Sequence, residues 1–186
     1  FEHISVPPTL IAFGITTVPA DKVVSTDLKK AGNKLYLIKH NALANYMPNV
    51  EQLKENWTYT TNAIQSGKVC ATFALGFGGV AEALAKMSFG NELAVNIQIA
   101  ENELFDYNYG SILVEATEDL SLPAAQYIGT VIEGTHLVIN GEQVSREVLL
   151  HACCGQFDKI YPSAVPAQHQ TLMPAETLLL TSNLSP

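Results

Sequence analysis

Residues 69–89 have the sequence VCATFALGFGGVAEALAKMSF, and this stretch decides the fold. Its first seven residues are mostly apolar, which is typical of a short buried strand. A glycine loop follows at 76–79, and beyond it apolar residues recur at the spacing of one helical face. The stretch therefore predicts a strand, a glycine loop and a helix that ends at Gly90-Asn91. The residues expected to share the buried face of this helix are Val80, Ala83, Leu84 and Met87.

Before this stretch, the sequence predicts two strands and a helix. Apolar runs favour strands at Thr9–Thr17 and Lys34–Lys39. The period then changes to that of a helix over Val50–Gln65, with Asn49 as its N-cap and Gly67 after its end. The apolar stripe expected to pack inward consists of Val50, Leu53, Trp57 and Ile64.

After the stretch, short apolar runs predict further strands, and Asn140-Gly141 fits the two-residue type I′ turn of a hairpin. A last helix is expected over Ser145–Phe157, with Ser145 at its cap. Strands and helices alternate early and a hairpin comes late, so we predict an α+β domain with a mixed β-sheet and packed helices. The other expected segments are strands at Leu93–Ile99, Ser111–Ala116, Tyr127–Ile132 and Thr135–Ile139 and a helical turn at Glu101–Tyr107.

The chain of 186 residues suits one domain, which we place at residues 1–161. Residues 162–186 hold three internal prolines and no clear period, so we expect a linker or a wrapping tail. Limited proteolysis should remove that tail and leave the domain folded. The chain starts Phe1-Glu2 without a signal peptide or an initiator Met, which predicts that it begins inside a longer polypeptide.

Composition excludes several classes of partner. The net charge is −8 and the ten Lys and Arg residues are scattered, which argues against nucleic acid or an anionic membrane surface. Only 15% of residues are charged, below the roughly 25% of ordinary globular chains, so a neighbour is expected to cover part of the surface. Three cysteines, Cys70, Cys153 and Cys154, make a poor disulfide framework, so we expect packed thiols in a reducing cytoplasm.

The glycine loop is the strongest candidate for chemistry. Backbone N–H groups at the start of a helix favour phosphate, and glycines let a ligand approach. The candidate phosphate- or nucleotide-binding residues are therefore Gly76, Gly78, Gly79 and Val80. The competing interpretation, which the residues alone favour, is that these glycines serve a tight turn and close packing of helix on strand. No Lys-Ser/Thr follows the loop, so it is not a Walker sequence.

Other reactive residues form no recognisable motif. We identify no catalytic residue and no metal ligands, since nucleophile elbows, paired carboxylates and ligand clusters are missing from the sequence. Glu82 and Lys86 lie four residues apart and are expected to form an ion pair on the helix. Asp106 with Tyr107 and Tyr109 fits either a polar binding site or a structured turn. The histidines are widely spaced, at His3, His40, His136, His151 and His169.

Several segments together resemble the phosphoribosylformylglycinamidine synthase family. The likeness is to a C-terminal domain of the aminoimidazole-ribonucleotide (AIR) synthase type, and it runs in order over about residues 6–157. The matching segments are VPPTLI at 6–11, Phe13-Gly14, DLKKAGNKLYLI at 27–38, GGVAEALAKMSF at 78–89, Leu104-Phe105, GSILVE at 110–115 and IGTVI at 128–132.

The resemblance implies a domain of an ATP-dependent ligase in purine biosynthesis. Such enzymes convert formylglycinamide ribonucleotide plus glutamine to formylglycinamidine ribonucleotide, with ATP and Mg²⁺. It also implies two partners, a sister N-terminal domain of the AIR-synthase type and a glutaminase domain. The isolated chain is then expected to be inactive, with no cofactor assigned to it alone.

This sequence departs from the family pattern at the glycine loop. The family often has His-Asp-x-Ser-Asp-Gly-Gly there, whereas this chain has FALGF at 73–77. The acids that would hold Mg²⁺ are absent, and Tyr107 stands nearest to a Glu usual in the family. Two alternatives therefore stay open. The domain is either a degenerate half that scaffolds its sister domains, or another superfamily member such as a selenophosphate synthetase or a thiamine-phosphate kinase.

Overall fold

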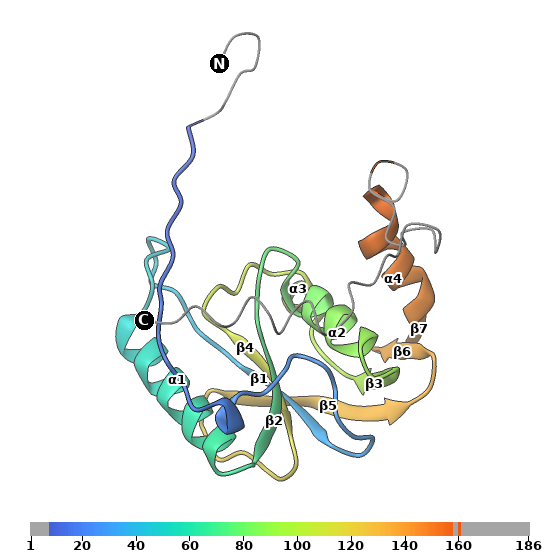
Figure 1. The fold of residues 1–186 in the computed structure, drawn as a ribbon, viewed down its shortest axis with the longest axis horizontal. Coiled ribbons are helices and arrows are strands. Elements are labelled where there is room, and N and C mark those ends of the chain that lie inside the picture. Colours follow the sequence, from blue (N-terminus) through green and yellow to red (C-terminus); the bar gives the residue numbers. More distant parts are fainter. Residues whose placement is uncertain (1–7, 158–159, 161–186) are drawn as a thin grey trace, which may run out of the picture.

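The computed structural model describes residues 8–157 and residue 160. Within them the sheet has seven strands, and the helices lie between and after these strands (Figure 1). The strands are β1 Lys34–Ile38, β2 Val69–Ala74, β3 Leu93–Ile97, β4 Ile112–Ala116, β5 Ala125–Glu133, β6 His136–Ile139 and β7 Glu142–Ser145. The helices are α1 Val50–Gln65, α2 Gly79–Phe89, α3 Glu101–Leu104 and α4 Arg146–Cys154, with short 3₁₀ turns at Ala20–Lys22 and Gly155–Phe157.

The sheet is mixed, as predicted. Its order is β2-β4-β1-β5-β3-β6-β7, and every neighbouring pair is antiparallel except β3 and β6. The β6–β7 hairpin turns at Asn140 and Gly141 with φ values of 54° and 91°, as a type I′ turn requires. The glycine loop lies between β2, an edge strand, and α2.

Helices α1 and α2 cover opposite faces of the sheet (Figure 1). Since side chains alternate along each strand, successive residues of one strand pack against different helices. On β1, Leu35 and Leu37 pack in the larger core with α2, whereas Tyr36 and Ile38 pack in a smaller core with α1. The predicted inward face of α2 is confirmed: Val80, Ala83, Leu84 and Met87 are all fully buried. This packing fixes the start of α2 against the sheet.

The predicted bounds of α1 are confirmed, but its predicted buried face is only partly right: Ile64 packs against the smaller core, whereas two of the four residues do not. Asn49 caps the helix by accepting the N–H of Gln52 at 3.2 Å. Val50 and Trp57 are half exposed, and the buried side chains are Asn56, Thr60 and Ala63. Their hydrogen bonds offset part of the cost of burial: the Asn56 side-chain N–H donates to the carbonyl of Lys39 and the Thr60 hydroxyl to that of Asn56. The side-chain oxygen of Asn56 is buried without a partner among the described residues.

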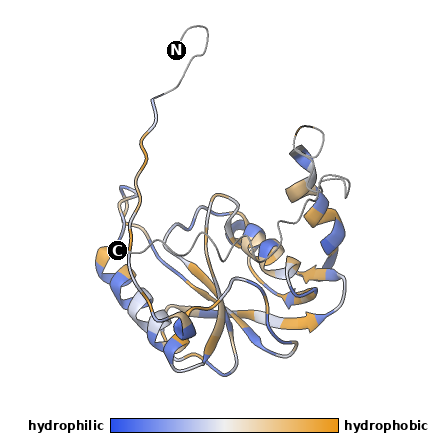
Figure 2. Cartoon of the chain, viewed as in Figure 1, coloured by the Kyte–Doolittle hydropathy of each residue, from blue (hydrophilic) through white to orange (hydrophobic). Residues whose placement is uncertain are grey.

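The predicted strand at Thr9–Thr17 is not observed. Its residues belong to no strand, and their large side chains are exposed. The segment runs away from the sheet as an extended, partly hydrophobic stretch of the chain (Figure 2). Leu10 is 95% exposed and Ile15 87%. An apolar run signals that a segment can be buried in a sheet, but it does not show that the partner strand belongs to the same chain. We call residues 9–18 the N-terminal segment.

Two details of the last helix also differ from prediction. Ser145 occupies the N-cap position of α4, but its side chain makes no capping hydrogen bond. Cys153 and Cys154 are exposed rather than packed. The predicted tail at 162–186 lies outside the described residues.

Candidate functional site

The glycine loop is held by close packing against a second loop. Gly79 opens α2 with a φ of 62°, and its N–H donates to the carbonyl oxygen of Gly76 at 3.1 Å. A Cβ on Gly79 would lie 2.8 Å from the backbone oxygen of Asp106 and 3.0 Å from that of Leu104. Only glycine fits this position, both for its conformation and for the approach of the two backbones.

Glu82 reaches back from the first turn of α2 into the same loop. One carboxylate oxygen accepts the N–H of Gly78 at 2.9 Å, and the other accepts a proton of the Lys86 ammonium at 2.6 Å. The hydrogen bond from Lys86 is the larger cause, and that from the N–H of Gly78 the smaller one, that holds the pKa of Glu82 below its ordinary value. The positive end of the helix therefore already faces a carboxylate of the chain itself.

The structure brings three of the four predicted phosphate-binding residues together. Gly76 and Gly78 line the loop, where a Cβ on either would meet the Glu82 side chain. Gly79 is buried behind them. Val80 is fully buried in the larger core, so only its backbone N–H remains a candidate ligand group. The sequence analysis predicted only the ion pair of Glu82 with Lys86. The signal for the additional capping role is a Glu within the first helical turn.

An exposed aromatic cluster borders the loop. Phe77 stacks on Tyr107 with 5.0 Å between ring centroids, and Tyr107 stacks on Tyr109 at 6.4 Å. Phe77 is 73% exposed, and each tyrosine is more than half exposed. We call Phe77, Tyr107 and Tyr109 the aromatic shelf. Asp106 and its two tyrosine neighbours therefore form a structured turn, and one with an accessible surface.

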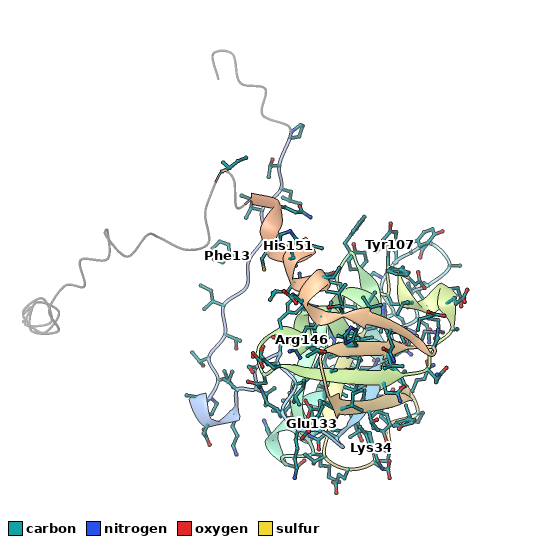
Figure 3. The ribbon with its side chains drawn as sticks, turned by 90° about the vertical axis from the view of Figure 1, so that its right-hand side faces the viewer. Phe13, Lys34, Tyr107, Glu133, Arg146 and His151 are labelled. Atoms are coloured by element: carbon teal, nitrogen blue, oxygen red, sulfur yellow. The ribbon has the colours of Figure 1, made fainter. Side chains whose placement is uncertain are left out.

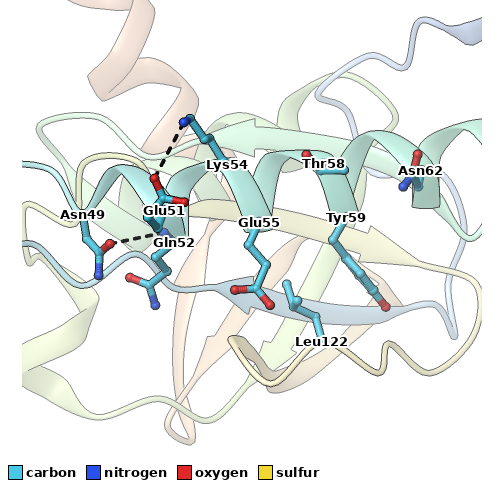
Figure 4. A pocket seen from close by; sticks show the side chains of 9 residues that line it. All are labelled: Asn49, Glu51, Gln52, Lys54, Glu55, Thr58, Tyr59, Asn62 and Leu122. Atoms are coloured by element: carbon cyan, nitrogen blue, oxygen red, sulfur yellow. Dashed lines mark hydrogen bonds and ion pairs between the residues drawn. The ribbon is translucent and has the colours of Figure 1, made fainter.

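Other hollows lie elsewhere on the domain. One, of about 830 Å³, runs along the outer side of α1 between Asn49 and Asn62 and does not include the glycine loop (Figure 4). Its lining is polar, and Glu51 and Lys54 pair across one turn of the helix there. A second, of about 600 Å³, lies beside the start of α2 and is lined by apolar residues such as Leu104, Leu137 and Leu149.

Glu115 is a buried carboxylate that the sequence analysis did not single out. It lies on β4 with no exposed surface, and its oxygens accept the backbone N–H of Lys29 at 2.7 Å and of Lys30 at 3.0 Å. The side-chain amide of Asn33 donates to it at 2.6 Å. These bonds fix the turn that enters β1. The signal in the sequence is a single acid inside the apolar run of residues 111–116.

Several solved structures share the fold of this chain. PurLQS from Thermotoga maritima matches with a TM-score of 0.61 and 14% identity, over 71% of this chain and 28% of that one. PurL of the same organism complexed with ATP matches at 0.55 and 13%, with the same shares. Its complex with FGAR matches at 0.55 and 12%, over 70% and 30%. The chain has an AIR-synthase-like fold.

The predicted fold class is thus confirmed. At 12–14% identity the likeness concerns the AIR-synthase-like fold alone, and the chain spans less than a third of the length of these PurL chains. No protein-family profile matches the sequence, and neither does any curated protein. A thiamine monophosphate kinase from Aquifex aeolicus matches at a TM-score of 0.45, too low to favour that enzyme.

Two further observations on the AIR-synthase-like domain concern metal ions and membranes. Within residues 8–157 and 160, no group of three His, Cys, Asp or Glu side chains could hold a metal ion. In the same part of the chain, every helix is too short or too polar to span a bilayer.

Proposed function

We propose that this chain is the C-terminal AIR-synthase-type unit of a PurL-like ligase. The enzyme would use ATP and glutamine to convert formylglycinamide ribonucleotide to formylglycinamidine ribonucleotide, in the cytoplasm. The observation that supports this most is the structural match of 71% of the chain to PurLQS, beside the resemblance of its sequence segments to the same family. In this proposal the unit supplies one wall of a shared active site and does not catalyse the reaction alone.

The glycine loop is the part of this wall that we assign to phosphate. Gly79, Val80 and Ala81 open α2, so their N–H groups have no acceptor within the helix. The N–H of Gly79 donates instead to the carbonyl oxygen of Gly76. The amides of Val80 and Ala81 then remain for an anion. Glu82 places a negative charge beside them, so phosphate binding by this domain alone is expected to be weak.

The residues of the loop do not fit a Mg²⁺ ion. Glu82 is the only acid between residues 73 and 89, and both of its oxygens already accept hydrogen bonds. A hard cation needs several oxygen ligands. If the ligase uses Mg²⁺, the ligands belong to another part of the enzyme, and we assign no step through the metal to this chain.

Partner domains are also part of the proposal. The N-terminal segment exposes Leu10, Ile11, Phe13 and Ile15 almost completely, which is unusual for a free-standing domain. This supports a sister N-terminal domain that covers the segment. A glutaminase domain would supply ammonia, since the described residues hold no arrangement that could release it.

The first test is activity. We expect no ATP- and glutamine-dependent formation of formylglycinamidine ribonucleotide by the purified chain, measured as product against a control without enzyme. Turnover above that control would contradict the proposal that the chain is one part of a shared site.

The second test maps phosphate. Millimolar inorganic phosphate and ATP should shift the amide resonances of Gly78 to Ala81. Glu82→Gln removes the competing charge but keeps a hydrogen-bond acceptor, so it should strengthen phosphate binding severalfold. The matched control is Glu55→Gln, an exposed acid on α1, which should leave the affinity unchanged. Shifts centred elsewhere, or no gain in Glu82→Gln, would contradict the assignment.

The alternative is a degenerate half that scaffolds its sister domains. One observation favours it: the Glu82 carboxylate already accepts the N–H of Gly78, which a phosphate would otherwise use. On this view, phosphate and ATP shift no resonance at the loop even when Glu82 is replaced by Gln. The two functions therefore predict opposite results in the same titration.

A further inference from the structure

A cavity of about 640 Å³ lies between the loop before α1 and the loop before β4. The first loop contributes Tyr46, and the second contributes Asp106, Tyr107 and Tyr109. His40 closes the base of the cavity. This cavity is distinct from the phosphate-assigned amides of α2, and nothing in the proposed ligase reaction uses it.

Both loops are held in place by their own hydrogen bonds. Tyr46 has a φ of 60°, uncommon for a non-glycine residue, and its N–H donates to the carbonyl oxygen of Leu43 at 2.9 Å. Leu43 in turn donates to Met47 at 2.9 Å. The turn therefore presents the Tyr46 side chain, which is 94% exposed, in a defined position at the cavity.

His40 ties the second loop to the start of α1. Its Nε2 accepts the N–H of Asn49 at 3.0 Å, so Nδ1 carries the hydrogen and donates to the carbonyl oxygen of Tyr109 at 2.7 Å. Gly110, with a φ of 89°, allows this approach, because a Cβ there would lie 3.0 Å from His40 Nδ1. Both ring nitrogens are hydrogen-bonded within the domain, so His40 offers no free donor to a ligand.

The charge of the cavity is negative and unbalanced. Its lining includes Asp106 and no Lys or Arg. Within the described residues, Asp106 has no ion pair and its carboxylate makes no hydrogen bond, unlike Glu82, Glu103 and Asp119. The side-chain amide of Asn108, also in the lining, has a buried N–H group without a partner in this part of the chain, but the one charged side chain of the lining is Asp106, so a phosphate would be repelled by it whereas a cation would gain a partner.

The aromatic rings favour the same sign of charge. The faces of Tyr46, Tyr107 and Tyr109 carry the negative side of the ring quadrupole, which attracts cations. The rings of Tyr107 and Tyr109 stack on each other within 18° of parallel, and each is more than half exposed, so flat ring surface remains for a planar group. Guanidinium is planar, stacks on tyrosine and pairs with both oxygens of a carboxylate.

We propose that this cavity binds a guanidinium group, which stacks on Tyr107 or Tyr109 and pairs with Asp106. The group is carried either by an arginine of a partner polypeptide or by a free small molecule. The single arginine of this chain, Arg146, donates to the carbonyl oxygens of Leu93 and Gly134, so the ligand is not its own arginine. The cavity is thus a second binding site beside the glycine loop.

The test titrates the 186-residue chain with guanidinium probes while amide resonances are followed by NMR. N-acetyl-arginine methylamide and free arginine should shift the resonances of residues 42–48 and 106–110. The citrulline counterparts, which have the same shape without the charge, should bind at least about tenfold more weakly, because a charged hydrogen bond is lost. Tighter binding of the blocked arginine indicates a polypeptide as the source, and tighter binding of free arginine a small molecule.

Two variants and a control make the test specific. Asp106→Asn should weaken binding of the arginine probes about tenfold, and Tyr107→Leu about threefold through loss of the ring face. Glu133→Gln is the control: it changes an exposed acid that lies at the other end of the domain from Tyr107 (Figure 3) and should leave affinity unchanged. Equal binding of citrulline, an unchanged affinity in Asp106→Asn, or phosphate shifts centred on 106–110 would overturn the proposal. These outcomes are independent of any phosphate binding at Gly78 to Ala81.

Discussion

Gly79 combines two constraints at one residue, a left-handed backbone and contact with a second backbone. Alanine in the left-handed region costs about 1–2 kcal/mol. The contact of a Cβ with the oxygens of Asp106 and Leu104 adds about 1–3 kcal/mol. We therefore expect Gly79→Ala to lower the free energy of unfolding by about 2–5 kcal/mol in urea denaturation.

The matched control for this substitution is Gly32→Ala. Gly32 has a φ of 92°, but a Cβ there would have no atom within 4 Å, so only the backbone term applies. Its loss should be about 1–2 kcal/mol. Equal losses in the two variants would show that the approach of residues 104–106 contributes nothing to stability.

Glu115 is the second residue with a testable role. Glutamine has one acceptor oxygen where glutamate has two, and its amide would face the donors of Lys29 or Lys30. We expect Glu115→Gln to lower the free energy of unfolding by about 2–3 kcal/mol, since buried donors lose a charged acceptor. Calorimetry or urea denaturation measures this change.

Glu118→Gln gives the comparison for Glu115, because Glu118 pairs with Lys68 at 2.6 Å on the surface, where both side chains are about half exposed. Exposed ion pairs contribute about 0–1 kcal/mol. If Glu118→Gln proves as destabilising as Glu115→Gln, the bonds of the buried carboxylate are not what holds the turn before β1.

At the scale of the element, α2 should make stability depend on pH. The pKa of Glu82 is lowered from 4.5 by Lys86 and by the N–H of Gly78, so the folded state binds its proton less readily than the unfolded state. This contribution is fully present above pH 4.5 and is lost as the pH falls through the lower folded pKa. The unfolding free energy measured from pH 6 to pH 3 should therefore fall less steeply in Glu82→Gln.

A slope unchanged by Glu82→Gln would contradict the capping role of this carboxylate. Lys34→Met provides a control of another kind, since it removes a partner of Asp119. Lys34 and Tyr36 hold the pKa of Asp119 below its ordinary range, so this variant alters the acid slope without touching α2. The two variants together separate the helix cap from the strand β1.

Elements show where sequence reasoning succeeds and where it does not. The bounds of α1 and of β1 were predictable because caps, glycines and changes of period are local signals. The buried face of α1 was not, because Asn56 and Thr60 are buried through hydrogen bonds that the apolar pattern does not record. The same limit applies to Glu82, whose bond to the N–H of Gly78 depends on the loop geometry rather than on composition.

At the scale of the whole molecule, the mixed α+β architecture was predictable but the strand order was not. The alternation of predicted elements indicated a sheet with helices, and the structure confirms it. Nothing local indicates that β1 lies between β4 and β5, which follow it by some 80–90 residues. The glycine loop and Asp106 with Tyr107 and Tyr109 were singled out from sequence, but the cavity that joins the latter to residues 40–48 needed the fold.

This strand order has a consequence for folding on the ribosome. Tyr36 in β1 pairs with Tyr127 in β5, which is synthesised 91 positions later. At about 5–20 residues per second, β1 waits roughly 5–20 s before its second neighbour emerges. During that time the alternating apolar residues of β1 have no finished sheet to enter, and nascent chains offer them incorrect partners. Pairing between strands so far apart in sequence slows folding, so this topology delays completion of the sheet until β5 has been synthesised.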